Sequence, residues 1–297
     1  MKILHVCAGW QQWNGAANIA RMIMDEQRHE GHEVSFTTWA KVRELRAADE
    51  VWIHCGWLPC LWWAAIWGRN VHWMPEACYD PVRLHFHGWK KWFVGSMERW
   101  CLRRCDRIVA TCEAEKGWIE KYLGKRCPAV EVTDVKRFFK LGSGGVVKNS
   151  QLMTHDSQLH LLYLGRRHPL KGVEYLGTAV RQIQDSSAYS ASSRLCVKYI
   201  SNAFGDELEK VWDWCDVLVL PTLSDNFGLV IAEALERGKR VITTDGAPAW
   251  GGGNDYGGRL VFLKGFRDGT DKVRVGLLKD AIAKLVGMDE QKRMHDL

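Results

Sequence analysis

Several motifs that define common kinds of site are missing from this chain. It has no D-x-D triplet, so the sequence does not indicate a metal ion that bridges a bound nucleotide. It also has no G-x-G-x-x-G run, which argues against a dinucleotide cofactor at its first turn. Cys101 and Cys105 are not accompanied by a second C-x-x-C or by a histidine pair with zinc spacing, so buried thiols are favoured over a metal site. The apolar run at residues 55–67 is too short to span a bilayer.

Length and composition indicate a globular protein of two domains. The 297 residues suffice for two cores of ordinary size, and the hydrophobic fraction of 46% and charged fraction of 26% are typical of soluble proteins. A stretch rich in Gly, Ser and polar residues predicts a linker at 141–157. It separates a Rossmann-like domain at 1–140 from a second at 158–275, and a C-terminal helix follows at 276–297. Helical spacing in the apolar residues extends this helix back to about residue 271.

Residues 221–233 carry the most chemical information, because they place Asp225 and Glu233 eight positions apart around Gly228. The apolar, β-branched run before them predicts a strand buried in a parallel sheet. Cap-type residues precede Gly228, and Gly228 itself lets the backbone approach a ligand. A helix that begins at Leu229 would offer N–H groups and its positive dipole end to a diphosphate. Glu233, expected two turns further in, would accept hydrogen bonds from hydroxyls such as a ribose diol.

A second segment, residues 161–172, again combines a strand, a glycine, a basic loop and a helix. Arg166 and Lys171 stand five positions apart across a loop that contains proline. This spacing lets a guanidinium and an ammonium converge on phosphate oxygens from one side.

The N-terminus has a third strand–loop–helix unit. Residues 2–7 predict a strand, and the small residues Gly15 and Ala16 open a helix that ends near a G-H-E-V sequence. Small residues suit a loop that approaches a substrate through its backbone.

Together the three segments resemble the family 4 retaining glycosyltransferases, which have the GT-B architecture of two Rossmann-like α/β domains with a cleft between them. The family motif is an acid, any residue, Phe, Gly, four residues and Glu. Asp225, Phe227, Gly228 and Glu233 fill these positions, with Asp in place of the usual first Glu. The second domain is expected to be shortened, because a polar stretch at 184–193 leads directly to the next strand.

This resemblance implies roles for particular residues. Arg166 and Lys171 would hold the donor diphosphate, Glu233 the ribose and Asp225 the donor sugar, and these four are the candidate catalytic residues. The residues expected to line the donor site are Gly15, Ala16, Asn226, Phe227, Gly228 and Leu229. No cofactor or metal is expected, because helix dipoles and basic side chains stabilise the leaving group in such enzymes.

Three residues of the first domain, His54, Glu76 and Asp80, are weaker candidates for the acceptor or donor-sugar side. Many relatives read Pro-His-Gly where this chain has Pro-Glu-Ala, and the histidine there helps to position the donor hexose. Glu76 is therefore the departure that most threatens a catalytic interpretation, with His54 or His72 as substitutes.

Cysteine and tryptophan usage bear on location. The ten cysteines form no regular framework and no signal peptide is evident, so we expect a reduced cytoplasmic protein. Of 16 tryptophans, 13 lie between Trp10 and Trp118, and residues 88–107 mix them with Lys and Arg. This combination suits a helix in an anionic membrane interface, and a core helix with solvated basic residues is the alternative. The net charge of +6 favours the membrane. No nucleic-acid module is present, so nucleic acid is not an expected partner.

The sequence therefore predicts a retaining, metal-independent transferase that moves a sugar from a nucleoside diphosphate sugar to a saccharide or lipid-linked acceptor, as in lipopolysaccharide or other surface-glycan synthesis. Two alternatives stay open. One is a catalytically impaired relative that only binds nucleotide sugar, and the other is a sugar-nucleotide epimerase of the same fold. The nucleotide base, the sugar and the acceptor are not fixed by the sequence.

Overall fold

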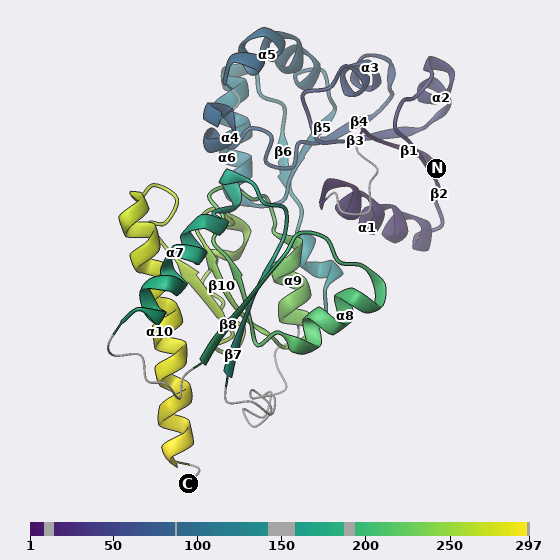
Figure 1. Ribbon diagram of the computed structural model, residues 1–297. Helices are drawn as coiled ribbons and strands as arrows, with labels where there is room; N and C mark the ends of the chain where they lie inside the picture. Colours follow the sequence, from purple (N-terminus) through teal and green to yellow (C-terminus); the bar gives the residue numbers. More distant parts are fainter. Residues whose placement is uncertain (9–14, 87, 142–157, 187–193, 296–297) are drawn as a thin grey trace. The chain divides into compact units, whose positions relative to one another are not determined.

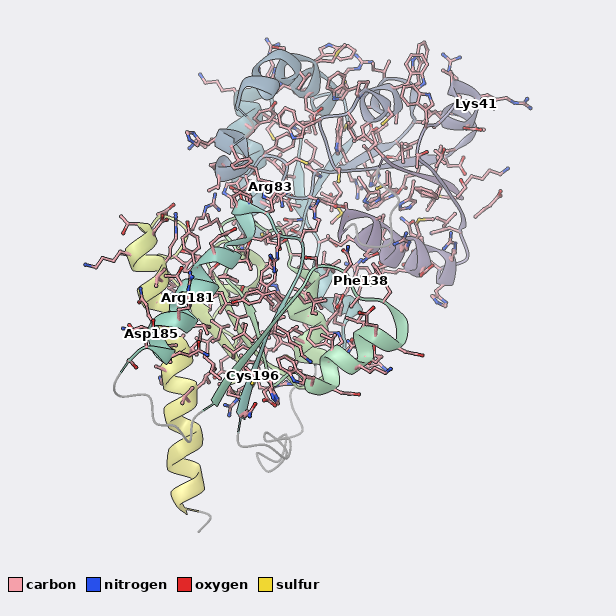
Figure 2. All side chains as sticks on the ribbon, viewed as in Figure 1. Lys41, Arg83, Phe138, Arg181, Asp185 and Cys196 are labelled. Carbon is pink, nitrogen blue, oxygen red and sulfur yellow. The ribbon has the colours of Figure 1, made fainter. Side chains whose placement is uncertain are left out.

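The computed structural model describes residues 1–8, 15–86, 88–141, 158–186 and 194–295. The chain forms two compact units, Met1–Phe138 and Phe139–Leu297 (Figure 1). Phe138, which ends unit 1, is labelled in Figure 2. Most of the predicted linker at 141–157 lies outside the described residues.

Unit 1 is built on a six-stranded parallel sheet with the order β2-β1-β3-β4-β5-β6. Its strands are β1 Lys2–Cys7, β2 Glu33–Thr37, β3 Glu50–His54, β4 Val71–Met74, β5 Arg107–Ala110 and β6 Val130–Val132. Its helices are α1 Gly15–His29, α2 Val42–Ala47, α3 Pro59–Trp67, α4 Pro81–Phe86, α5 Gly88–Leu102 and α6 Glu113–Leu123. Figure 1 shows α1 on one side of the sheet and α2 and α3 on the other. Both faces are thus covered, which explains the nearly continuous apolar runs of the central strands.

Helix α1 packs closely because its buried face, apart from Gln27, is made of small and aliphatic residues. These are Ala16, Ala17, Ile19, Ala20, Ile23 and Met24. The sequence prediction of a helix that opens at Gly15 agrees with this element.

Unit 2 has a five-stranded parallel sheet with the order β11-β10-β9-β7-β8. Its strands are β7 Gln158–Leu164, β8 Arg194–Ile200, β9 Val217–Leu220, β10 Arg240–Thr244 and β11 Leu260–Leu263. Its α-helices are α7 Val173–Gln184, α8 Gly205–Trp214, α9 Leu229–Glu236 and α10 Asp271–His295. Figure 1 shows α7 and α10 side by side on one side of the sheet, and the two helices pack against each other. Every residue of β9 is buried, as expected for a central strand.

The strand order changes direction once in each sheet. In unit 1 the chain adds β2 on one side of β1 and then β3 on the other, and in unit 2 it adds β8 and β9 on opposite sides of β7. Ligands of open α/β sheets bind outside the carboxyl ends of the strands at such a switch point. The topology therefore singles out the loops after β7 and β9, which are the basic and acidic segments of the sequence.

The helix predicted over residues 88–107 is shorter than expected. Helix α5 ends at Leu102, and Arg107 already begins β5. Between them Asp106 accepts a hydrogen bond from the backbone N–H of Val71 at 2.6 Å, which fixes the entry into β5 beside β4. Within the described parts of the chain, no helix is both long and apolar enough to cross a bilayer.

Candidate functional site

The loop after β7 carries the basic residues of unit 2. Arg166 is exposed, and its backbone carbonyl accepts a hydrogen bond from the Tyr163 hydroxyl at 2.8 Å. His168 accepts one from the backbone N–H of Leu170 at 3.2 Å and so caps the short 3₁₀ helix Pro169–Lys171. These contacts hold the loop in shape while the Arg166 side chain faces solvent.

The basic loop is bonded directly to the acidic loop that follows β9. The carbonyl oxygen of Leu170 accepts hydrogen bonds from Leu223 N at 2.8 Å and from Thr222 Oγ1 at 3.0 Å. Gly172 has a φ of +62°, and a Cβ added there would lie 2.0 Å from the carbonyl oxygen of Pro221. Only glycine fits this approach, because a side chain would meet both a strained φ and a backbone clash.

Lys171 and Asp225 form an ion pair where the two loops meet. Their side chains are 17% and 18% exposed, so the pair is largely shielded from water. The backbone of Asp225 is fixed as well, since its N–H donates to Gly246 O at 2.7 Å and its Oδ1 accepts from Asn226 N at 2.9 Å. The sequence placed these two charges in one donor site, and the structure brings them into contact.

Helix α9 begins directly after this pair. Gly228 is its N-cap, with a φ of +67°, and glycine has no side chain that could cap the helix. Phe227 is 2% exposed and its carbonyl accepts a hydrogen bond from the Trp250 indole, so Phe227 anchors the loop instead of offering its ring to a ligand. Leu229 is the first helical residue. The first N–H groups of an α-helix point out of its N-terminus, where they can bind an anion.

Glu233 is the fifth residue of α9, so it lies in the second turn and nearer to the helix start than predicted. Burial raises its pKa, and the nearby Arg237 partly opposes this effect. The raised pKa marks a carboxyl group that is poorly solvated.

The two candidate donor residues of unit 1 lie at the start of α1. Gly15 is exposed, and Ala16 is 8% exposed against the sheet. They belong to unit 1, whereas the Lys171–Asp225 pair belongs to unit 2. The loop before Gly15 lies outside the described residues.

His54 and Glu76 contact each other at the carboxyl end of the unit 1 sheet. His54 Nδ1 lies 3.2 Å from Glu76 Oε1, and their side chains are 0% and 4% exposed. Asp80 is also fully buried and accepts a hydrogen bond from Val82 N at 2.8 Å at the start of α4. His72 lies on β4 with its ring nitrogen 3.8 Å from a Glu50 oxygen. His54, Glu76 and Asp80 were expected on the acceptor or donor-sugar side, with His54 or His72 as substitutes for the family histidine. All four residues are buried here, and that role stays a prediction.

Sequence reasoning missed three partners of these groups. His5 and Gln27 extend the contact of His54, and Glu115 lies beside Glu76 and accepts from Ala77 N at 2.5 Å. His5 had a usable signal, because it is a polar residue within an otherwise apolar strand. Gln27 and Glu115 had none, since both lie on amphipathic helices where polar residues are ordinary.

Within the described residues, no group of three or more His, Cys, Asp or Glu side chains is arranged to hold a metal ion. Cys101 and Cys105 are buried, and the Cys105 thiol donates to the Cys101 carbonyl at 3.4 Å. Burial raises the pKa of Cys101 to about 12, so this thiol is neutral near neutral pH.

No protein-family model matches this chain. An uncharacterised glycosyltransferase of Methanocaldococcus jannaschii is 27% identical over 108 residues, and the match spans 30% of this chain and 28% of that protein. Among solved structures, sucrose-phosphate synthase of Thermosynechococcus elongatus has a TM-score of 0.64 at 13% identity, over 100% of both chains. WaaG, a glycosyltransferase involved in lipopolysaccharide biosynthesis, has a TM-score of 0.61 at 11% identity, over 95% of this chain and 90% of that chain.

HepE of Anabaena in complex with UDP-glucose has a TM-score of 0.58 at 13% identity, over 100% of both chains. Two parallel sheets with flanking helices, matched over the whole chain, are the two-Rossmann-like GT-B fold of glycosyltransferases. The fold class predicted from the sequence is therefore confirmed.

Proposed function

We propose that this protein is a retaining glycosyltransferase that uses a nucleoside diphosphate sugar as its donor. The observation that carries the proposal is the Lys171–Asp225 pair, which lies after β7 and β9 beside the start of α9. A cation, a carboxylate and a helix N-terminus at the switch point of a parallel sheet form a site for a phosphorylated sugar. The ligands bound in the HepE structures, UDP and UDP-glucose, support the same donor class.

The main chemical task is to stabilise the leaving diphosphate. Lys171, Arg166 and the N–H groups at the start of α9 would neutralise the charge that develops on it. An ammonium group has three N–H donors, so Lys171 can bridge the Asp225 carboxylate and a phosphate oxygen. With these groups as the electrophilic partners, the reaction needs no metal ion or cofactor.

The two carboxylates would divide the sugar and nucleotide contacts. Asp225 is held through its N–H, which donates to Gly246 O, and through its Oδ1, which accepts from Asn226 N, and it would orient the donor sugar together with Lys171. Glu233, one helical turn further on, would accept the ribose hydroxyls.

The acceptor would be a saccharide or a lipid-linked glycan, as in cell-envelope synthesis. The similarity to WaaG, a glycosyltransferase involved in lipopolysaccharide biosynthesis, supports this class of acceptor. On α5, Met97 and Trp100 are 45% and 46% exposed, and the Arg104 guanidinium lies 4.9 Å from the Trp100 ring centroid. Exposed apolar side chains beside a cation suit peripheral binding to an anionic cytoplasmic membrane surface.

A binding experiment tests the donor site. UDP, GDP, ADP and dTDP are added separately at millimolar concentration, and the melting temperature is measured. Binding to the native state alone stabilises it by about 2.7 kcal/mol at 100 times Kd. At least one nucleotide should raise the melting temperature, and this rise should be smaller in Lys171→Ala. If all four leave the wild type unchanged, the donor site is wrongly assigned.

The second candidate is a relative that binds nucleotide sugar without turnover. It is favoured by Glu76, which stands where the resemblance predicts a histidine and is buried against His54. This candidate predicts a nucleotide-dependent rise in melting temperature together with no release of nucleoside diphosphate from any donor.

A further inference from the structure

Four buried side chains in unit 1 form an unbroken chain of hydrogen bonds. Gln27 Oε1 on α1 lies 2.7 Å from His5 Nε2 on β1, and His5 Nδ1 lies 3.0 Å from His54 Nε2 on β3. His54 Nδ1 then lies 3.2 Å from Glu76 Oε1, directly after β4. All four residues are 7% exposed or less. The chain thus links a helix on one side of the sheet to a loop at the carboxyl end of its strands.

The two imidazoles give this chain a direction. A neutral imidazole donates through one ring nitrogen and accepts through the other. Because the Gln27 oxygen accepts, His5 and then His54 must each carry hydrogen on Nε2. His54 Nδ1 is then an acceptor, so Glu76 must donate to it as a protonated carboxylic acid. In the reverse arrangement Gln27 donates through its amide nitrogen, both histidines carry hydrogen on Nδ1, and Glu76 is a carboxylate. The two arrangements differ by one proton.

The surroundings of Glu76 favour the protonated arrangement. Burial, followed by the charge of Glu115, raises the pKa of Glu76 well above its ordinary value. Burial raises the pKa of Glu115 as well, but its hydrogen bonds from Ala77 N at 2.5 Å and from Thr111 N and Thr111 Oγ1 at 2.8 Å oppose this effect and favour its ionised form. Burial also lowers the pKa of His54 to about 3 and, with the neighbouring His54, lowers that of His5.

Other ionisable groups on the surrounding elements face this chain of hydrogen bonds. The Cys55 thiol donates to Glu76 Oε2 at 3.9 Å, and Cys78 and Cys7 lie beside Cys55. Arg83 on α4, labelled in Figure 2, weakly lowers the pKa of Glu76. Arg28 and His72 act on His5. For both Glu76 and His5, burial changes the pKa more than any of these groups does.

We propose that Gln27, His5, His54 and Glu76 form a reversible proton relay, in which the loss of one proton reverses every hydrogen bond of the chain. The Glu76 proton moves to His54 Nδ1, the Nε2 proton of His54 moves to His5 Nδ1, and the Nε2 proton of His5 passes to a water or buffer base. The Gln27 amide turns to donate to His5. One proton leaves, and only O–H and N–H bonds change. The inference is independent of the proposed glycosyltransferase function.

The loop after β4 is the part of the fold that such a change would affect. Glu76 and Ala77 have φ values of +55° and +59°, a strained conformation for residues with a side chain. In the deprotonated state Glu76 carries a charge next to Glu115, and Glu115 holds the Ala77 N–H. Repulsion between the two carboxylates would loosen this loop, so the relay is a pH-sensitive device at the carboxyl end of the sheet.

The direct test is the tautomeric state of the two histidines in the full-length protein, measured by ¹⁵N NMR of the imidazole rings as pH is raised. Both rings are expected to carry hydrogen on Nε2 at neutral pH and to change together to Nδ1 at higher pH. Opposite tautomers in the two rings would overturn the relay. So would a change in one ring without the other, or hydrogen on Nδ1 at neutral pH.

A matched pair of variants separates the two buried acids. In Glu76→Gln the amide donates to His54 at every pH, so both rings should keep hydrogen on Nε2 throughout the titration. In Glu115→Gln an amide NH₂ faces N–H donors, so this variant should be far less stable than Glu76→Gln. If Glu115→Gln does not fold, the Glu76→Gln titration still decides, and a wild-type-like tautomer change there would contradict the proposal.

Stability against pH gives an independent readout. Because the pKa of Glu76 is raised in the folded state, its contribution to folding stability is complete when the pH lies below its pKa in the unfolded chain. This contribution is lost as the pH rises toward its pKa in the folded state. The ratio of the wild-type unfolding constant to that of Glu76→Gln should therefore rise about tenfold per pH unit within this window. The histidine contributions, which are lost as pH falls below their unfolded value, are common to both proteins and cancel. A flat ratio would contradict a protonated Glu76.

Discussion

Replacement of Lys171 by alanine separates the structural role of the Lys171–Asp225 pair from its role in binding. The change leaves the Asp225 carboxylate largely buried without its cation, because the side chains are only 17% and 18% exposed. Removal of one partner of a buried pair costs about 3–5 kcal/mol, and the residual exposure places this site at the lower end, about 3 kcal/mol. Chemical denaturation followed by tryptophan fluorescence measures this loss of unfolding free energy.

The Glu209–Arg237 pair on the same unit is a matched control. The Glu209 side chain is 60% exposed, so Glu209→Ala should cost at most about 1 kcal/mol. The double variant Lys171→Ala/Asp225→Ala contains no unpaired charge, so it should recover much of the stability lost in the single variant. It should not recover nucleotide binding, because the phosphate contact is still missing. A Lys171→Ala cost as small as that of Glu209→Ala, or a double variant no more stable than the single, would refute the reasoning.

Three further predictions concern separate parts of the chain. Gly172→Ala should destabilise the protein by more than about 1 kcal/mol, because its Cβ would meet Pro221 O at 2.0 Å and its φ is positive. The control Gly117→Ala in α6, where an added Cβ has nothing within 4 Å, should stabilise the protein by about 0.5–1 kcal/mol. Equal effects in thermal unfolding would contradict the close approach of the loops. Glu233→Ala should retain the fold and lose nucleotide-dependent stabilisation, whereas the control Glu236→Ala should keep both. Calorimetric titration with nucleotide compares the two variants, and an unchanged affinity in Glu233→Ala would show that Glu233 is not part of the site. Wild-type protein should sediment with anionic vesicles and be released by salt, and Trp100→Ser/Arg104→Glu should bind these vesicles less. Equal binding of the wild type to neutral vesicles would indicate that α5 has no membrane role.

The sequence predicted most of unit 2 because its signals were local. The buried strand before residue 221, the basic loop at Arg166 and Lys171, and the helix from Leu229 all follow from short patterns of apolar, small and charged residues. The Lys171–Asp225 contact joins loops 54 positions apart in the chain, and the parallel order of β7 and β9 brings them together. Only the resemblance to a known family placed the two charges in one site in advance.

The errors arose where tertiary contacts override local pattern. The α5 helix was predicted too long, because its basic residues continue into a turn that Asp106 ties to Val71. The buried hydrogen bonds of His54 and Glu76 were not predicted, because they depend on residues far apart in the sequence, and the expected place of these two residues on the acceptor or donor-sugar side stays a prediction.

The most direct test of the central claim is the release of nucleoside diphosphate from a panel of nucleotide sugars. The panel covers UDP-, GDP-, ADP- and dTDP-linked hexoses, with saccharide and lipid-linked acceptors, and it is run without added metal. We expect that at least one donor is consumed, that the product keeps the anomeric configuration of the donor by NMR, and that Lys171→Ala/Asp225→Ala is inactive although folded. Nucleotide binding without release from any donor, or release that the double variant performs equally well, would contradict it.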